Sequence, residues 1–67
     1  MGADFVVSDQ GTIWVFNPLT NAARVFSRNE LGLESWQWLG DGFAVDHRPA
    51  ILQAEQLANE GWKLEAI

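Results

Sequence analysis

The chain has 67 residues, contains no cysteine and carries a formal net charge of -5 at pH 7. This length allows one domain, over residues 1–67, and the missing cysteine excludes disulfides and thiolate metal sites. Four Trp and four Phe supply most of the mass for a core, because each large aromatic can bury roughly 150–250 Å². A chain this short buries only about 60% of its unfolded surface, so we expect marginal stability.

The acidic surplus lies in the second half of the chain. Residues 1–28 contain two acidic and two basic side chains, whereas residues 29–67 contain seven acidic and two basic ones. Nucleic-acid backbones require Lys and Arg, so we expect no direct nucleic-acid binding. An acidic face suits a partner protein with a basic surface, and it also serves simply to keep a small protein soluble.

Targeting signals are missing from the sequence. Residues 1–16 lack the basic start of a signal peptide, and no apolar run approaches the ~20 residues of a membrane span. We therefore expect a cytoplasmic protein that does not act at a membrane.

The first predicted unit is a β-hairpin. Residues 5–7 and 12–16 are rich in β-branched and aromatic side chains, and residues 8–11 between them form a turn cluster. Both faces of the second strand are apolar, so it is either covered on both sides or one face meets something outside the chain. Alternation places Ile13 and Val15 on one face, and Thr12, Trp14 and Phe16 on the other.

A short helix is predicted next, over residues 21–27. Pro18 ends the preceding strand because proline cannot donate to a ladder, and Thr20 is a favoured N-cap. We expect the sheet-facing side of this helix to hold Leu19, Ala23 and Phe26.

A second hairpin follows the loop at residues 31–34. Residues 36–39 alternate, which predicts a strand with Trp36 and Trp38 on one face. The Gly-Asp-Gly sequence at residues 40–42 is typical of a hairpin connection. We expect both tryptophans to pack on Phe43 and Val45 as cross-strand neighbours.

The longest helix is predicted over residues 50–60. Pro49 suits the first turn, and Gly61 suits the position just after the end. One sector of this helix is apolar, and Leu52 points away from it. The apolar sector consists of Ala50, Ile51, Ala54, Leu57 and Ala58.

A final edge strand is predicted over residues 62–66, which alternate with Trp62, Leu64 and Ala66 inward. The resulting order ββαββαβ predicts an α/β fold of the two-layer α+β type. In this fold a small, mostly antiparallel sheet carries two packed helices.

The one histidine, His47, lies in the polar triplet Asp46-His47-Arg48. Metal sites use three or four convergent ligands, and neighbours in a strand point to opposite faces, so Asp46 and His47 are not expected to converge. We interpret Asp46 as the cap of the following helix. The serines lack a G-x-S-x-G elbow, and no Gly-rich loop has phosphate-binding spacing. We therefore predict no catalytic, cofactor or metal site, with a small hydrolase-like enzyme using His47 as the least favoured alternative.

Three motifs carry a resemblance: Gly11-Thr12-Ile13, Pro18-Leu19-Thr20 and Val45-Asp46-His47-Arg48. With them the chain resembles a group of short, uncharacterised bacterial proteins found in proteobacterial genomes and on mobile elements. The group has no assigned activity, so the resemblance implies no functional residue. It implies an accessory role on a phage or plasmid.

These observations predict a small, acidic, non-enzymatic protein that binds another protein with a basic surface. In the setting that the resemblance implies, the hypothesis is an inhibitor of a host nuclease or defence complex, with carboxylates in the place of phosphates. The alternative is a homodimeric accessory protein, paired through the strand of Trp14 and Phe16 or through the edge strand over residues 62–66. The candidate partner-binding residues are Leu52, Glu55, Gln56, Glu60, Trp14 and Asp41.

Overall fold

Strands and helices follow one another in the predicted order ββαββαβ in a computed structural model that describes residues 2–67. Met1, the first residue of the predicted domain, lies outside the described residues. The elements are β1 (Phe5–Asp9), β2 (Ile13–Pro18), α1 (Asn21–Glu30), the 3₁₀ turn η1 (Ser35–Gln37), β3 (Trp38–Leu39), β4 (Gly42–Asp46), α2 (His47–Asn59) and β5 (Leu64–Ala66).

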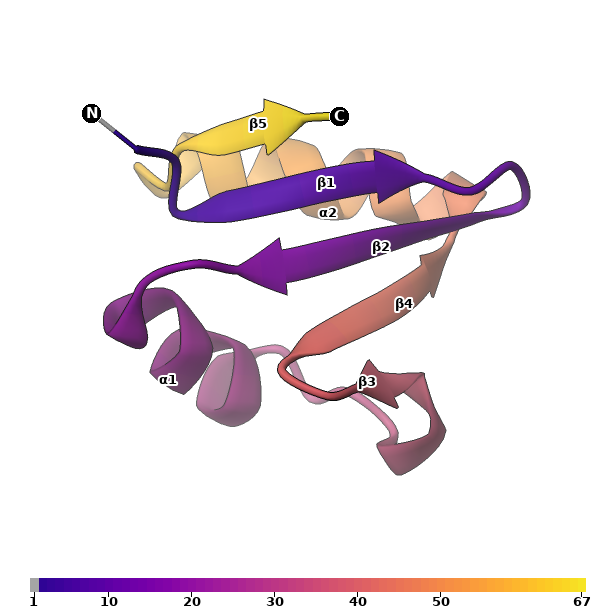
Figure 1. Cartoon of the computed structure of the whole chain (residues 1–67), viewed down its shortest axis with the longest axis horizontal. Helices are drawn as coiled ribbons and strands as arrows, with labels where there is room; N and C mark the ends of the chain where they lie inside the picture. The colour runs from indigo at the N-terminus through magenta and orange to yellow at the C-terminus, as the bar shows by residue number, and fades with distance from the viewer. Residues whose placement is uncertain (1) are drawn as a thin grey trace.

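The strands form one mixed sheet in the order β3-β4-β2-β1-β5 (Figure 1). The pairs β1·β2, β2·β4 and β3·β4 are antiparallel, and β5 runs parallel to β1 at the edge. The prediction of a mostly antiparallel sheet is therefore confirmed. The parallel pair arises because α2 carries the chain across the sheet between β4 and β5.

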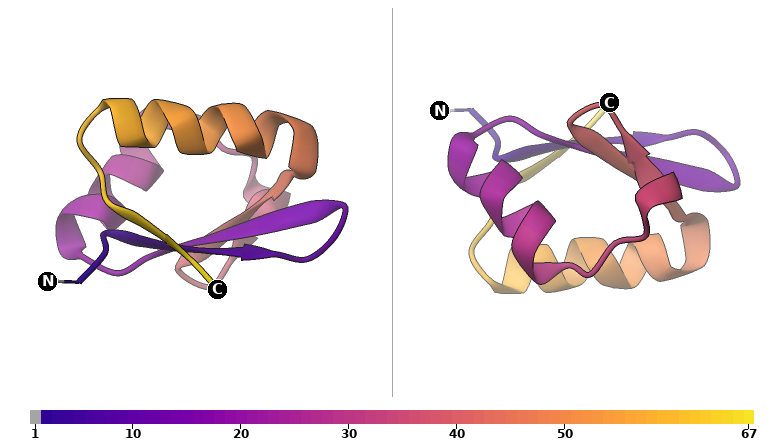
Figure 2. Two further views of the ribbon diagram at one scale, coloured as in Figure 1. Left: turned by 90° about the horizontal axis from the view of Figure 1, so that it is seen from above. Right: turned by 90° about the horizontal axis from the view of Figure 1, so that it is seen from below.

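Both helices cover the same face of the sheet (Figure 2). α2 runs along one side of the strands, and α1 lies on that same side. The arrangement is a two-layer α+β fold. Within residues 2–67 no helix covers the other face.

The core lies between the sheet and the helices. At its centre the rings of Phe16 and Phe43, which are cross-strand neighbours, stack with centroids 5.2 Å apart and an interplanar angle of 2°. The ring of Trp62 packs edge-on against that of Phe5, with centroids 5.7 Å apart. The buried hydrophobic residues are Phe5, Val7, Phe16, Ala23, Phe43, Val45, Ala50 and Leu57.

α1 begins where the sequence predicts. The Oγ1 atom of Thr20 accepts a hydrogen bond from the backbone N–H of Ala23 at 3.1 Å, which confirms the N-cap. The buried hydroxyl of Ser27 donates to the Ala23 carbonyl at 2.8 Å, so no polar group is left unsatisfied there. Leu19 is exposed, contrary to prediction. Its N–H donates to the Asp4 carbonyl at 2.7 Å, which continues the strand pairing past buried Pro18 and turns Leu19 outward.

α2 starts at His47, earlier than predicted, with Pro49 in its first turn. Asp46 occupies the N-cap position, but among the described residues its carboxylate accepts no capping hydrogen bond, so the capping prediction is wrong. The N–H of His47 donates instead to the carbonyl of Thr12 at 2.9 Å. The end of β2 therefore binds the start of α2 directly.

α2 ends in a Schellman motif. Gly61, with φ of 96°, donates its N–H to the Ala58 carbonyl, and the N–H of Trp62 donates to the Leu57 carbonyl, each at 3.0 Å. Only glycine adopts this backbone conformation without strain. The motif turns the chain back so that Trp62 reaches the core before β5 begins.

The close approach of β4 to β2 makes Gly42 a sensitive position. A Cβ atom there would lie 2.9 Å from the Phe16 carbonyl oxygen and 3.3 Å from Oδ1 of Asn17. We expect Gly42→Ala to lower the free energy of unfolding by about 1–3 kcal/mol, the usual cost of overpacking. Chemical denaturation measures the change. The control is Gly2→Ala, where a Cβ has open space; equal stability of the two variants would contradict the packing described.

Candidate functional site

Asp46 and His47 approach each other, contrary to the prediction. His47 Nδ1 lies 3.5 Å from Asp46 Oδ1, because His47 is the first residue of a helix and strand alternation no longer separates the two side chains. In residues 2–67 no three His, Cys, Asp or Glu side chains cluster in a way that could hold a metal ion. The pair offers at most two ligands, fewer than protein metal sites use.

Asp41 belongs to a contact between the β3–β4 turn and α1. Its carboxylate oxygens lie 3.8 Å from Nε of Arg24 and 3.9 Å from a terminal nitrogen of Arg28. The guanidinium of Arg28 also lies over the ring of Trp38, 5.0 Å from its centroid. Exposed ion pairs of this kind are worth about 0–1 kcal/mol. Asp41 is thus engaged with α1, and the structure does not place it beside the candidate residues of α2.

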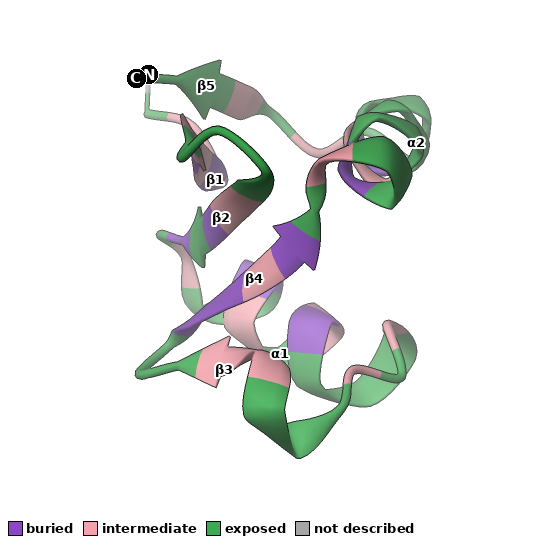
Figure 3. Cartoon of the chain, turned by 90° about the vertical axis from the view of Figure 1, so that its right-hand side faces the viewer, coloured by how far each residue is buried: buried purple, intermediate pink, exposed green. Residues whose placement is uncertain are grey.

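Four candidates share one surface, which we call the outer stripe (Leu52, Glu55, Gln56 and Glu60). All four are exposed. Leu52, Glu55 and Gln56 lie on the side of α2 away from buried Ala50 and Leu57, a side that is exposed along the helix (Figure 3), and Glu60 is the C-cap at the helix end. Leu52 is 65% exposed, as its helical position predicts. Neither helix of residues 2–67 has the length and apolar character needed to cross a membrane.

Ile51 and Ala58 differ from their prediction, because both are exposed. The sheet contact is centred on Ala50 and Leu57, with Ala54 partly buried beside them. At 100° per residue Ile51 lies about 90° from that centre, which takes it out of the contact.

Trp14 and Phe16 do not face outward. Phe16 is fully buried, and Trp14 packs half-buried against the same core. The helix-covered face of β2 is therefore the one with the aromatic residues, and Trp14 is not part of the outer stripe. The prediction of a homodimer that pairs through Trp14 and Phe16 is therefore wrong, because the core of the same chain already covers these side chains. Ile13 and Val15 point to the uncovered side.

The uncovered side of the sheet forms a second candidate surface that the sequence did not single out. We call it the open face (Val6, Ser8, Ile13, Val15, Leu39 and Ala44). Strand alternation opposite the buried residues places these side chains there, and the register sets Val15 beside Ser8 and Ala44. A groove of about 570 Å³ crosses it, lined by Gln10, Thr12, Ile13, Val15, Trp36, Leu39 and Ala44.

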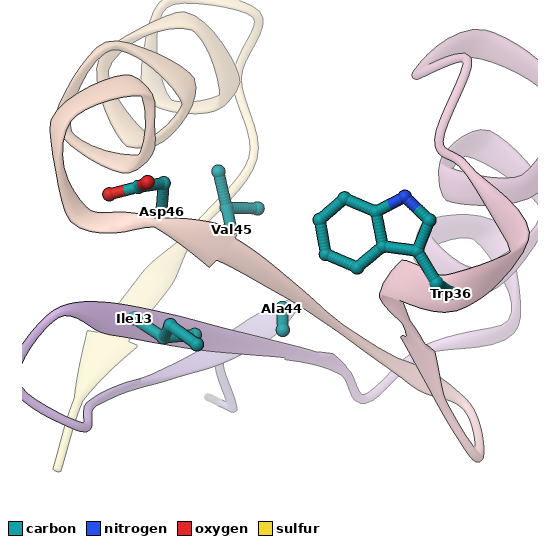
Figure 4. Close-up of a pocket in the computed structure, with 5 residues that line it drawn as sticks. All are labelled: Ile13, Trp36, Ala44, Val45 and Asp46. Atoms are coloured by element: carbon teal, nitrogen blue, oxygen red, sulfur yellow. The ribbon is translucent and has the colours of Figure 1, made fainter.

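Trp36 stands at the rim of this groove instead of sharing a face with Trp38. It is 73% exposed, whereas Trp38 packs edge-on against Phe43 at 5.7 Å between centroids. The predicted strand over residues 36–39 is therefore shortened to β3, because residues 35–37 form η1. Figure 4 shows the Trp36 ring reaching toward β4 beside Ala44 and Val45.

Gln37 explains the change from strand to turn. Its Oε1 accepts from the backbone N–H of Glu34 at 2.9 Å, and its Nε2 donates to the Ala44 carbonyl at 3.0 Å. The side-chain amide of Gln37 thus bonds to β4 where a backbone N–H of a longer β3 would have done so. The backbone N–H of Gln37 instead donates to the Glu34 carbonyl within the turn. The three-residue spacing of Glu34 and Gln37 is that of a capping box, a signal that could have revealed η1.

Comparisons with known proteins identify no relative. The chain matches no family model, and neither the curated proteins nor the solved structures include a significant match. The two surfaces are therefore interpreted from their own residues.

The bridging role of Gln37 gives a direct test. We expect Gln37→Ala to lower the free energy of unfolding by about 1 kcal/mol, since two hydrogen bonds are lost at a partly exposed site. The indole N–H resonance of Trp36 should move with it in an NMR spectrum, because η1 loses its anchor. Gln56→Ala, an exposed glutamine of α2, is the control, expected within about 0.5 kcal/mol of the parent chain. An unchanged Trp36 signal in Gln37→Ala would contradict the role.

Proposed function

We propose that the protein is a non-enzymatic module that binds another protein through the outer stripe of α2. The observation that carries the proposal is the exposure of Leu52, 65% exposed, beside Glu55 and Gln56 on a helix whose other side is buried. A single apolar side chain can enter a pocket of a partner, while the surrounding charges set orientation and association rate.

The carboxylates of the outer stripe are available to a partner. The ion pairs within residues 2–67 engage Asp41 and Asp46, and none of them includes Glu55 or Glu60. The arginines of α1 lie toward Asp41, whereas exposed Arg48 in the first turn of α2 partly offsets the two carboxylates. With a net charge of -5, the chain attracts a basic partner surface at long range.

The partner class that fits this surface is a protein that normally binds phosphates. Lys and Arg that receive a nucleic-acid backbone also receive carboxylates, so an acidic helix can occupy the same site. Together with the resemblance to mobile-element proteins, this supports inhibition of a host nuclease or defence complex as the biological role.

A pull-down from bacterial lysate tests the proposal with a matched pair of variants. Leu52→Lys changes the outer stripe, and Leu39→Lys makes the same substitution at a leucine of comparable exposure, 57%, on the open face. We expect the parent chain and Leu39→Lys to retain the same basic protein, and Leu52→Lys to lose at least about 90% of it, a tenfold change in affinity. Retention should also fall as salt is added, because salt shortens the Debye length and so screens the attraction between the carboxylates and the basic partner. Recovery of no specific protein, or equal recovery by both variants, would contradict the proposal.

A further inference from the structure

The groove on the open face continues into a smaller pocket beside η1. The groove of about 570 Å³ and the pocket of about 90 Å³ are joined, because Ile13, Trp36 and Ala44 line both. The pocket has two further lining residues, Val45 and Asp46, so its walls are apolar except at one carboxylate. Ligand pockets in proteins are mostly apolar hollows of about 300–1,000 Å³ with a few polar groups. The joined hollow has this size and character.

Asp46 and Trp36 stand on opposite sides of the small pocket (Figure 4). Ala44 and Val45 lie between them, and the carboxylate of Asp46 reaches away from the indole ring. An occupant therefore meets an aromatic wall on one side, apolar side chains in the middle and a negative charge on the other side. Lysine and arginine side chains have the matching order, because they lay an apolar stem along apolar surface and end in a positive head.

The basic side chains of the chain itself leave this pocket open. Asp46 has His47 as its neighbour at 3.5 Å, and no Lys or Arg of residues 2–67 forms an ion pair with it. Trp38 shows the opposite case, since the guanidinium of Arg28 lies 5.0 Å from its ring centroid and 3.9 Å from Asp41. The chain thus supplies its own cation to one tryptophan and aspartate, and supplies none to the pair at this pocket.

We propose that the open face binds an amphipathic basic helix of another protein, with apolar side chains in the groove and a lysine or arginine at Asp46. Charge complementarity selects this partner, because a positive head group gains an ion pair with the carboxylate and an acidic chain is repelled by it. A helix is the suitable element, since α1 and α2 cover the other face of the same sheet (Figure 2). Trp36, 73% exposed at the rim, supplies an aromatic anchor.

An NMR titration with two synthetic peptides tests the site. Both peptides carry the same leucines in an amphipathic helical pattern, and their polar positions are all lysine in one and all glutamate in the other. We expect the leucine–lysine peptide, at up to about 1 mM, to shift the indole N–H signal of Trp36 and the methyl signals of Ile13, Val15 and Leu39. The leucine–glutamate peptide should bind at least about tenfold more weakly, because like charges repel. Equal binding of the two peptides, shifts confined to Leu52 and the rest of α2, or no shifts at all would overturn the inference.

Matched variants assign the contacts of the leucine–lysine peptide. Trp36→Ala and Leu52→Ala each remove one exposed apolar side chain, and Asp46→Asn and Glu55→Gln each remove one exposed carboxylate, so each pair changes composition and charge alike. At the open face we expect Trp36→Ala to weaken binding at least about tenfold, and Asp46→Asn about two- to fivefold, the range of one exposed ion pair. Leu52→Ala and Glu55→Gln should bind the peptide there like the parent chain.

Equal weakening within either pair of variants would overturn the inference. The inference does not depend on the proposed function, because it uses the opposite face of the molecule. Loss of partner capture by Leu52→Lys leaves it untouched, so the two proposals fail separately.

Discussion

The stack of Phe16 on Phe43 is the contact on which the rest of the structure depends. The two rings are fully buried and nearly parallel, 5.2 Å apart, and they join the first hairpin to the second across β2 and β4. Trp38 packs on Phe43 from the next strand. The lack of a side chain at Gly42 lets the β4 backbone lie against the Phe16 carbonyl. Because the stack occupies one face of the sheet, the helices that cover it must lie on that face too.

One-sided coverage gives the molecule two unlike surfaces. α1 leaves the end of β2 and α2 leaves the end of β4, and both return over the aromatic face. The outer side of α2 is left with exposed Leu52 among charged and polar side chains, whereas the far side of the sheet is left largely apolar. These surfaces differ in charge and point in opposite directions, so they suit different partners. The account of function rests on this separation.

The sequence predicted what depends on local chemistry. The element order, the Thr20 cap, the Gly61 termination and the outward Leu52 follow from side-chain types and spacing. Prediction from the sequence failed where a hydrogen bond comes from a residue far along the chain instead of from a neighbouring residue. The start of α2 is bound by the carbonyl of Thr12 and not by Asp46, and the amide of Gln37 turns Trp36 out of its strand. Which apolar face of β2 is covered depends on helices elsewhere in the chain, so alternation alone could not decide between Trp14 and Ile13.

The separation of a covered and an open face is tested most directly by methyl NMR in dilute solution with a soluble paramagnetic agent. The agent relaxes methyl groups in proportion to their access to solvent. The account predicts strong relaxation of the methyls of Ile13, Val15 and Leu39 and weak relaxation of those of Val7, Val45 and Leu57. Equal protection of the two sets would mean that the monomer covers both faces of its sheet, which would contradict the account.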